Sequence, residues 1–426
     1  SLKANPELIE YLEKLGFNRI VKRVQEFQSN EHTEKSKENS SKKEEENVSL
    51  ETSQAPASKE LSFKVCREKK DFDQLLGEIE KSEQVSTVLD YTTHEDLFKR
   101  RVGLIGLQVN GDVYVVNFKN PNAETFHKDE LFALLERTWG DKNKLVISPD
   151  IKTDLTHAVT IESPFVARYF DAAQASFVVD PSGPRTLEAL MAEKTSWELP
   201  EKEKKESTLE MDFERASQHM ATRVQALSEV HQTLEEELKE REVSHIYHDI
   251  DGPLIEVLAK MERQGIRIDK EFFHKMEKEL QEKLDEIQKQ VDAYSQNTVN
   301  LNSPKQVGEF LFQELELPVI KKTKTGASTD SEVLEELVSR NLSEVPGLIL
   351  QYREYGKLLS TYVKALPELI NPTSGRLHTS FNQNVAQTGR LSSTHPNLQN
   401  IPIRTDLGRK VRRGFVTDEG NVLLGA

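Results

Sequence analysis

Apolar and polar positions change their spacing along the chain, and each spacing predicts a kind of element. Residues 102–109 and 113–118 alternate around Asn110-Gly111, which predicts a β-hairpin closed by a type I′ turn. Such a hairpin among short apolar runs and amphipathic segments predicts an α/β domain over about 61–200. The other elements expected there are strands at 85–89 and 145–147 and helices at 132–139 and 164–170.

Beyond residue 246 the apolar positions recur every three or four residues, as on the buried face of a helix. Asp251-Gly252-Pro253 begins one helix, because proline is favoured in the first turn. Asp269 is expected to cap a long helix over about 270–296, and a second long helix is expected over 345–369. From the pattern alone, these helices predict a bundle or a coiled coil.

The first 60 residues divide into two parts. Residues 1–27 predict one amphipathic helix or two short ones, with Gly16 as a natural end of the first. Residues 28–60 are rich in Ser, Glu, Lys and Asn and nearly free of apolar side chains. Such a segment cannot bury enough surface to offset the entropy of ordering, so we expect a disordered linker.

Composition narrows the class of protein. A chain of 426 residues with 36% hydrophobic and 30% charged residues suits two to four globular domains with much solvated surface. Its single cysteine, Cys66, excludes a disulfide framework and a cysteine-based zinc site. No apolar run approaches 18 residues, so no membrane contact is expected.

One basic tract stands out in this acidic chain. Residues 388–415 hold six lysines and arginines and one aspartate, a net charge of +5, whereas the whole chain carries −15. Gly389 and two prolines prevent one continuous helix there. Arginine, asparagine and glutamine side chains suit base edges and phosphate oxygens. The tract therefore indicates a site for a polyanion; the alternative is a solvated loop beside a basic helix.

The run TGRLSSTHPNLQNIPIRTDLGRKVRRGF resembles the start of the palm of family A DNA polymerases. The resemblance implies an α+β multidomain chain, in which a ribonuclease-H-like α/β exonuclease domain precedes a helical thumb. In the family the next strand carries a catalytic Asp, so this chain is expected to end one residue before it and not to polymerise. The expected domains are a 5′-nuclease stub (1–27), a linker (28–60), a degenerate 3′–5′ exonuclease-like domain (61–235), the thumb (236–375) and the first part of the palm (376–426).

The resemblance also implies DNA contacts. Arg390 would reach the minor groove at the primer terminus, and Arg404 would contact a phosphate. Primer–template duplex is the expected partner of a monomeric, cytoplasmic, nucleoid-associated bacterial protein, and dNTP and Mg²⁺ are expected only in the intact parent. The other expected DNA-binding residues are Asn397, Gln399, Asn400, Arg353, Lys357, Lys321, Lys322, Lys324, Thr325, Asn302, Ser303 and Lys305.

The exonuclease motifs that the resemblance implies are incomplete. Asp90 and Asp154 match two metal-binding carboxylates, but Thr92 stands where the family has Glu. The third motif, a Tyr four residues before an Asp, is expected to fall on Arg215 and His219. A register shifted by two, on Ser217 and Ala221, fits no better. We therefore expect no metal and no nuclease activity; the alternatives are an active 3′–5′ exonuclease with unorthodox ligands and a non-catalytic helical interaction or DNA-binding module.

Overall fold

A computed structural model of the chain describes residues 61–92, 94, 97–118, 126–160, 165–200, 207–323 and 326–424. The helix expected at 1–27 and the linker expected at 28–60 lie outside these residues. Ser58–Ala426 form one compact unit. Among the described residues, no helix is both long and apolar enough to cross a membrane.

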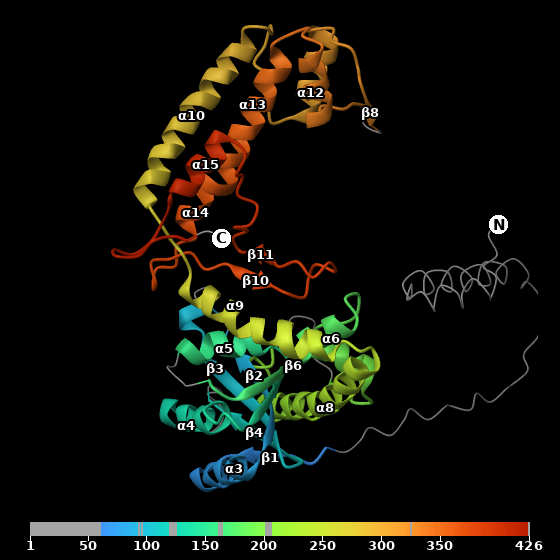
Figure 1. Cartoon of the computed structure of the whole chain (residues 1–426), viewed down its shortest axis with the longest axis vertical. Helices are drawn as coiled ribbons and strands as arrows, with labels where there is room; N and C mark the ends of the chain where they lie inside the picture. The colour runs from blue at the N-terminus through green and yellow to red at the C-terminus, as the bar shows by residue number, and fades with distance from the viewer. Residues whose placement is uncertain are drawn as a thin grey trace, which may run out of the picture. The chain divides into compact units, whose positions relative to one another are not determined.

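The first half of the described chain forms a six-stranded mixed sheet with helices on both faces (Figure 1). Its strand order is β1-β4-β3-β2-β5-β6, in which β3 and β4 form the expected hairpin. Asn110 and Gly111 have φ values of 52° and 89°, which confirms the predicted left-handed turn. The strands are β1 (Lys64–Cys66), β2 (Gln84–Tyr91), β3 (Val102–Val109), β4 (Asp112–Asn117), β5 (Leu145–Ser148) and β6 (Arg168–Asp171).

The helix expected at 164–170 is wrong. Arg168–Asp171 form strand β6, which pairs in parallel with β5, and the helix begins only at Ala172. Asp171 caps that helix by accepting a hydrogen bond from the Gln174 N–H at 2.7 Å. A short apolar run fits a buried strand and a helix equally well, and pairing with β5 decides between them here.

Each face of the sheet has its own core. On one face, Ile105, Val116 and Val146 of the sheet pack against α3, α4, α5 and the start of α9. On the other, Val88, Leu104 and Val115 pack against α6, α7 and the long α8. The helices are α3 (Lys69–Lys81), α4 (Lys128–Trp139), α5 (Ile151–Thr160), α6 (Ala172–Val179), α7 (Leu187–Lys194), α8 (Phe213–Glu240) and α9 (Gly252–Gln264).

The second half is helical, and α13 returns beside α10 (Figure 1). Asp269 caps α10 as predicted, by accepting from the Phe272 N–H at 2.9 Å, and α10 ends at Asp292 rather than near 296. The helices are α10 (Lys270–Asp292), α11 (Pro304–Glu309), α12 (Ser331–Ser339), α13 (Val345–Leu358), α14 (Ala365–Glu368) and α15 (Asp406–Arg413), with π-helical turns at Ile246–Asp251, Phe310–Glu314 and Leu359–Lys364. The strand pairs are β7 (Arg267–Ile268) with β12 (Phe415–Val416), β8 (Lys322–Thr323) with β9 (Gly326–Ala327) and β10 (Ser380–Asn382) with β11 (Ser392–Thr394).

An α/β domain followed by helices and short strand pairs confirms the expected fold class. The expected boundary at residue 235 lies inside α8, which continues to Glu240. The next helix, α9, falls within the expected thumb and packs against α5 of the α/β domain. The domain limits stay predictions.

Candidate functional site

Arg390 lies in the loop that joins β10 to β11, just before β11 begins. Gly389 has a φ of 72° and donates its N–H to the Ala386 carbonyl at 2.9 Å, which turns the chain at this point. The Arg390 side chain is exposed, and no described residue forms a hydrogen bond or ion pair with its guanidinium. The loop therefore presents a cation to solvent.

A polar turn follows β11. The Asn397 side-chain oxygen accepts from the backbone N–H groups of Gln399 and Asn400, both at 3.1 Å, and so closes the turn. The Tyr362 hydroxyl donates to the Asn400 carbonyl at 2.6 Å, which ties the turn to the helical region. Gln399 and Asn400 are exposed. Their side-chain amides are thus displayed on a backbone that is held in place.

The basic helix α15 neutralises part of its own charge. Lys410 pairs with Glu279 of α10, and Arg409 pairs with Asp406 in the first turn of α15. The pairing lowers the pKa of Glu279, mainly through the Lys410 hydrogen bond. The Arg404 side chain, by contrast, is exposed and has no polar partner among the residues that the structure describes.

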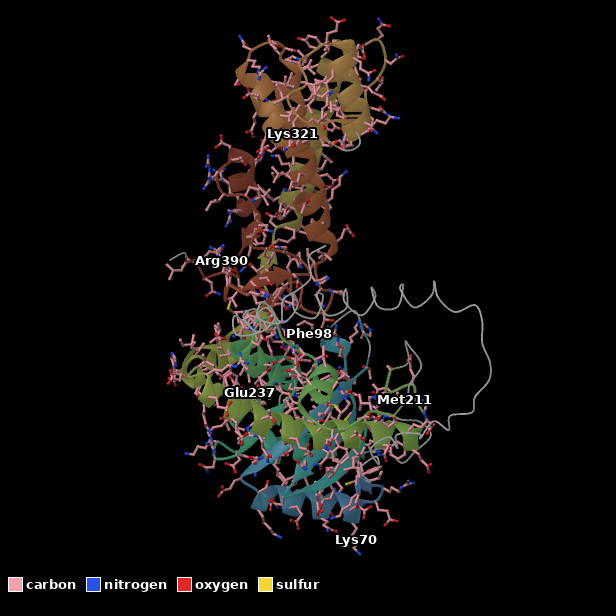
Figure 2. The ribbon with its side chains drawn as sticks, turned by 90° about the vertical axis from the view of Figure 1, so that its right-hand side faces the viewer. Lys70, Phe98, Met211, Glu237, Lys321 and Arg390 are labelled. Atoms are coloured by element: carbon pink, nitrogen blue, oxygen red, sulfur yellow. The ribbon has the colours of Figure 1, made fainter. Side chains whose placement is uncertain are left out.

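In the loop before α12, Lys321 is paired with acidic side chains, which the sequence alone does not indicate. Lys321 lies 3.0 Å from Asp330 and 3.6 Å from Glu332. A hydrogen bond from the Val333 N–H, followed by the one from Lys321, lowers the pKa of Asp330 to about 2. Figure 2 shows Lys321 and Arg390 far apart along this region. Lys322 is exposed, and the predicted residues Lys324 and Thr325 lie outside the described residues.

The other predicted residues, which lie just before α11 or in its first turn, have local contacts. Ser303 caps α11 by accepting from the Gln306 N–H at 3.4 Å. The Asn302 amide donates to the Tyr352 hydroxyl at 3.4 Å, and the Lys305 ammonium lies 3.9 Å from a Glu309 carboxylate oxygen. Asn302 and Lys305 are exposed, so both remain accessible.

Arg353 and Lys357 differ although they lie one turn apart on α13. Arg353 is half-buried and donates to the Thr329 carbonyl, and to the Thr329 hydroxyl at 3.2 Å. Burial lowers the pKa of its guanidinium. Lys357 is exposed. Arg353 therefore holds the segment before α12, whereas Lys357 is free to meet a ligand.

The α/β domain contains, next to Asp90, an arginine that the sequence motifs did not indicate. The Arg223 guanidinium lies 2.7 Å from an Asp90 carboxylate oxygen, and both side chains are more than four-fifths buried. It also lies 3.3 Å from Glu188. Asp90 is therefore engaged by an internal cation.

Of the two residues expected in the third motif, the structure places His219 near Asp90 and Arg215 away from it. Arg215 lies on the exposed side of α8, where it pairs with Asp212 at 3.8 Å. The residues of α8 that share a small cavity with Asp90 are His219 and Arg223, four positions apart. The rotation of α8 is set by the apolar side chains that it packs on the sheet, which the weak flanking sequence does not reveal. The clue in the sequence to the position of Arg223 was a basic residue one helical turn after His219.

Asp154, the second carboxylate, is held by neutral groups. It accepts hydrogen bonds from the Tyr91 hydroxyl at 2.7 Å and the Ser148 hydroxyl at 2.6 Å. Burial raises the pKa of Asp154 to about 7, against the lowering effect of these hydrogen bonds. Thr92 accepts the Arg101 N–H at 3.0 Å. Within the described residues no three His, Cys, Asp or Glu side chains are placed to hold a metal, so the family's Mg²⁺ does not fit here.

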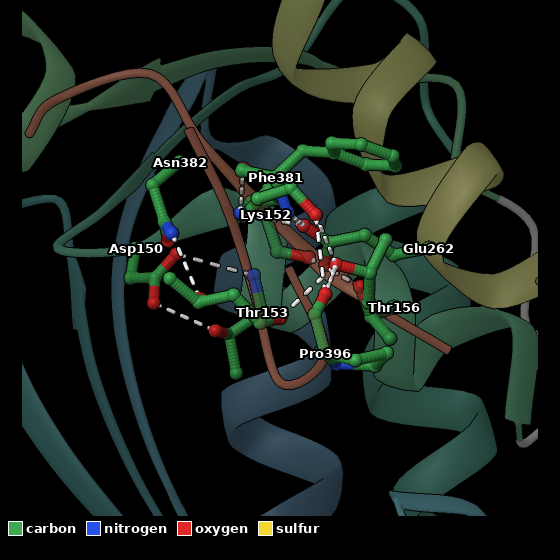
Figure 3. A network of polar contacts seen from close by, with 11 residues as sticks. Asp150, Lys152, Thr153, Thr156, Glu262, Phe381, Asn382 and Pro396 are labelled. Carbon is green, nitrogen blue, oxygen red and sulfur yellow. Dashed lines mark hydrogen bonds and ion pairs between the residues drawn. The ribbon is translucent and has the colours of Figure 1, made fainter. Parts of the chain in front are cut away.

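A polar cavity of 680 Å³ lies between the α/β domain and the β10–β11 hairpin. Its lining includes Tyr91 and Asp154 from the α/β domain, Glu262 from α9 and Asn382 from β10. The network beside it, drawn in Figure 3, joins α5, α9 and β10.

Comparisons with known proteins agree with this geometry. Residues 270–426 match the model of DNA polymerase family A. DNA polymerase I of Pseudomonas aeruginosa is 33% identical over 388 residues, which cover 88% of this chain and 42% of the relative. That of Caldicellulosiruptor bescii is 48% identical over 181 residues, which cover 42% of this chain and 21% of the relative. The chain thus spans less than half the length of these relatives.

A solved structure shows the same likeness. The polymerase domain of Pol1 from M. smegmatis, in complex with DNA primer–template and dNTP, matches with a TM-score of 0.72 and 27% identity. The match covers 84% of this chain and 59% of that one. The sequence match over the helical and C-terminal residues and the structural match over most of the chain agree with the resemblance carried by the basic tract. The chain therefore belongs to DNA polymerase family A.

Proposed function

We propose that the exposed residues of the basic tract 388–415 hold the primer–template duplex of a template-directed DNA polymerase. Such an enzyme is a nucleotidyltransferase of DNA replication and repair. The observation that carries the proposal is the exposure of the side chains of Arg390, Gln399 and Asn400 in a tract of net charge +5. In the minor groove every base pair presents acceptors in similar places, so donors there grip a duplex without reading its sequence.

Exposed cations elsewhere would hold the phosphates. Arg404, Lys357 and Lys322 are exposed, and none forms an ion pair with a described residue. Each such contact releases counterions, which makes binding fall steeply with salt. Lys321 would have to leave Asp330 to take part, so its contribution is smaller.

The test is a fluorescence-anisotropy titration of residues 1–426 with a labelled primer–template duplex at two salt concentrations. Saturable binding is expected, and Arg390→Ala is expected to weaken it by about fivefold or more, because an arginine contact to a base edge is worth about 1–3 kcal/mol. Arg168→Ala is the matched control, since Arg168 is an exposed arginine of the α/β domain whose side chain donates only to the Asn143 carbonyl among described residues.

Two outcomes would contradict the proposal. One is the absence of binding by the unchanged protein at low salt. The other is an equal loss of affinity in the Arg390 and Arg168 variants, which would indicate a general charge effect. In the same samples, added dNTP and Mg²⁺ should leave the primer length unchanged, because the described residues offer no carboxylate cluster for the metal.

The α/β domain is proposed to have no nuclease activity. Arg223 lies against Asp90, so a cation stands where a metal would need the carboxylate. A labelled single strand incubated with Mg²⁺ or Mn²⁺ should remain intact. Metal-dependent shortening that disappears on Asp90→Ala would favour the rival function, an active exonuclease with unusual ligands; shortening that persists in this variant would indicate a contaminant.

A further inference from the structure

A compact polar network joins the nuclease remnant to the hairpin that carries Arg390 (Figure 3). The Lys152 ammonium, on α5, donates to Glu262 of α9 at 2.8 Å and to the Phe381 carbonyl of β10 at 2.6 Å. The Phe381 N–H donates to the same Glu262 oxygen at 2.6 Å. The side chains of Lys152 and Glu262 are only 20% and 12% exposed.

The network holds main-chain atoms of the hairpin. The Phe381 carbonyl accepts from Lys152, and the Phe381 N–H donates to Glu262. These two side chains therefore satisfy the backbone groups that a further strand would otherwise pair with at this edge of β10. Hydrogen bonds with a charged partner are roughly twice as strong as neutral ones, and partial burial limits competition by water. The position of β10 therefore depends on an ion pair from two other elements.

Two more residues, one on each side of β10, make further contacts that hold the hairpin. The buried Gln383 amide donates to the Asp251 carbonyl at 2.9 Å. His378 packs edge-to-face on Phe98 of the α/β domain, with ring centres 5.1 Å apart, and its Nδ1 lies 2.7 Å from the Glu262 carbonyl. A hairpin with two three-residue strands is marginal by itself, so these contacts set its place.

We propose that Lys152, on the helix that carries the nuclease remnant Asp154, is a positioning residue for duplex binding. It fixes β10 and thereby the loop from which Arg390 projects. The α/β domain then contributes to DNA binding as a support and not through its former nuclease site. This inference rests on the proposed function, since it concerns the same duplex.

The first test measures duplex affinity. Lys152→Met removes both donated hydrogen bonds at similar length, and it is expected to weaken binding by about fivefold to tenfold through loss of a charge-assisted pair. Glu262→Gln should act in the same direction. Lys152→Arg should restore affinity to within about twofold, because a guanidinium still donates to both acceptors. Lys142→Met, which removes an exposed lysine of the same domain, is the charge-matched control.

A double-mutant cycle separates positioning from direct contact. If Lys152 acts through the hairpin, Lys152→Met should add little to the loss already caused by Arg390→Ala. Fully additive losses, with a lower salt dependence in the Lys152 variant alone, would mean that Lys152 binds a phosphate itself and would overturn the inference.

Hydrogen exchange gives a reading that does not depend on DNA. In Lys152→Met the amides of residues 380–394 should exchange faster, while the thermal midpoint of the α/β domain stays unchanged. Unchanged exchange would overturn the inference even if affinity falls. If the unchanged protein binds no duplex, the proposed function fails and so does positioning for DNA, and faster exchange would then show only that Lys152 holds the hairpin.

Discussion

Replacement of Phe273 by alanine is expected to lower the free energy of unfolding of the helical region by about 3–5 kcal/mol. Phe273 has no exposed surface and meets Phe415 edge-to-face, with ring centres 6.3 Å apart. Its ring lies directly on Gly414, where a Cβ would come within 2.3 Å of it. The residue thus joins α10 to the β7–β12 pair, and its loss leaves a cavity that the surrounding backbone cannot fill.

Unfolding of the helical region can be distinguished from that of the α/β domain by comparing circular dichroism with tryptophan fluorescence. Both tryptophans, Trp139 and Trp197, lie in the α/β domain, whereas the circular dichroism at 222 nm also reports the helical region. In urea, Phe273→Ala should shift the dichroism transition more than the tryptophan fluorescence. Tyr294→Ala, at a 47% exposed position just after α10, is the control and should change stability by about 1 kcal/mol at most. A similarly small shift for Phe273→Ala would contradict the prediction.

The second large effect is expected at Asp154 and depends on pH. Its pKa is raised to about 7 in the folded protein, mainly by burial, and its ordinary value is 3.8. Between these values the folded state binds more protons than the unfolded state. The stability that this proton confers is therefore full below about pH 4 and is lost as the pH rises through 7.

Asp154→Asn should remove this dependence. Between pH 5.5 and pH 8 the unchanged protein should lose about 2 kcal/mol more stability than the variant, read from tryptophan fluorescence in urea. The control is Asp73→Asn, which removes an exposed carboxylate of the same domain and should leave the pH dependence as it was. Parallel pH profiles for the protein and Asp154→Asn would show that Asp154 is already ionised at low pH.

Local signals in the sequence were sufficient for many elements. Asn110-Gly111 predicted a hairpin turn, and Asp269 predicted a helix cap, because each effect acts within a few residues. The segment 164–170 failed for the opposite reason, since a partner strand decided its conformation. The family resemblance, with its α/β domain and helical region, came from motifs and was confirmed.

The sequence predicted which residues belong to the candidate site better than it predicted which residues they contact. Arg390 and Arg404 are exposed as a binding role requires. Lys321 and Arg353 are also expected to bind DNA from the family resemblance. In the structure, however, Lys321 is paired with Asp330 and Arg353 donates to Thr329. Arg223 and the network of Lys152 join elements separated by more than 100 positions in the sequence. No local pattern encodes such contacts.

The ion pair of Arg223 and Asp90 links the occupation of this carboxylate to the stability of the fold. Removal of Arg223 alone would leave a mostly buried carboxylate without its cation, which costs about 3–5 kcal/mol for a buried pair. Glutamate at position 92 would remove the hydroxyl that accepts the Arg101 N–H. Each single substitution toward a metal site would therefore lower the stability of the fold before any metal could bind. On the proposal that this domain has no nuclease activity, the stability of the fold itself opposes a gain of that activity by single substitutions.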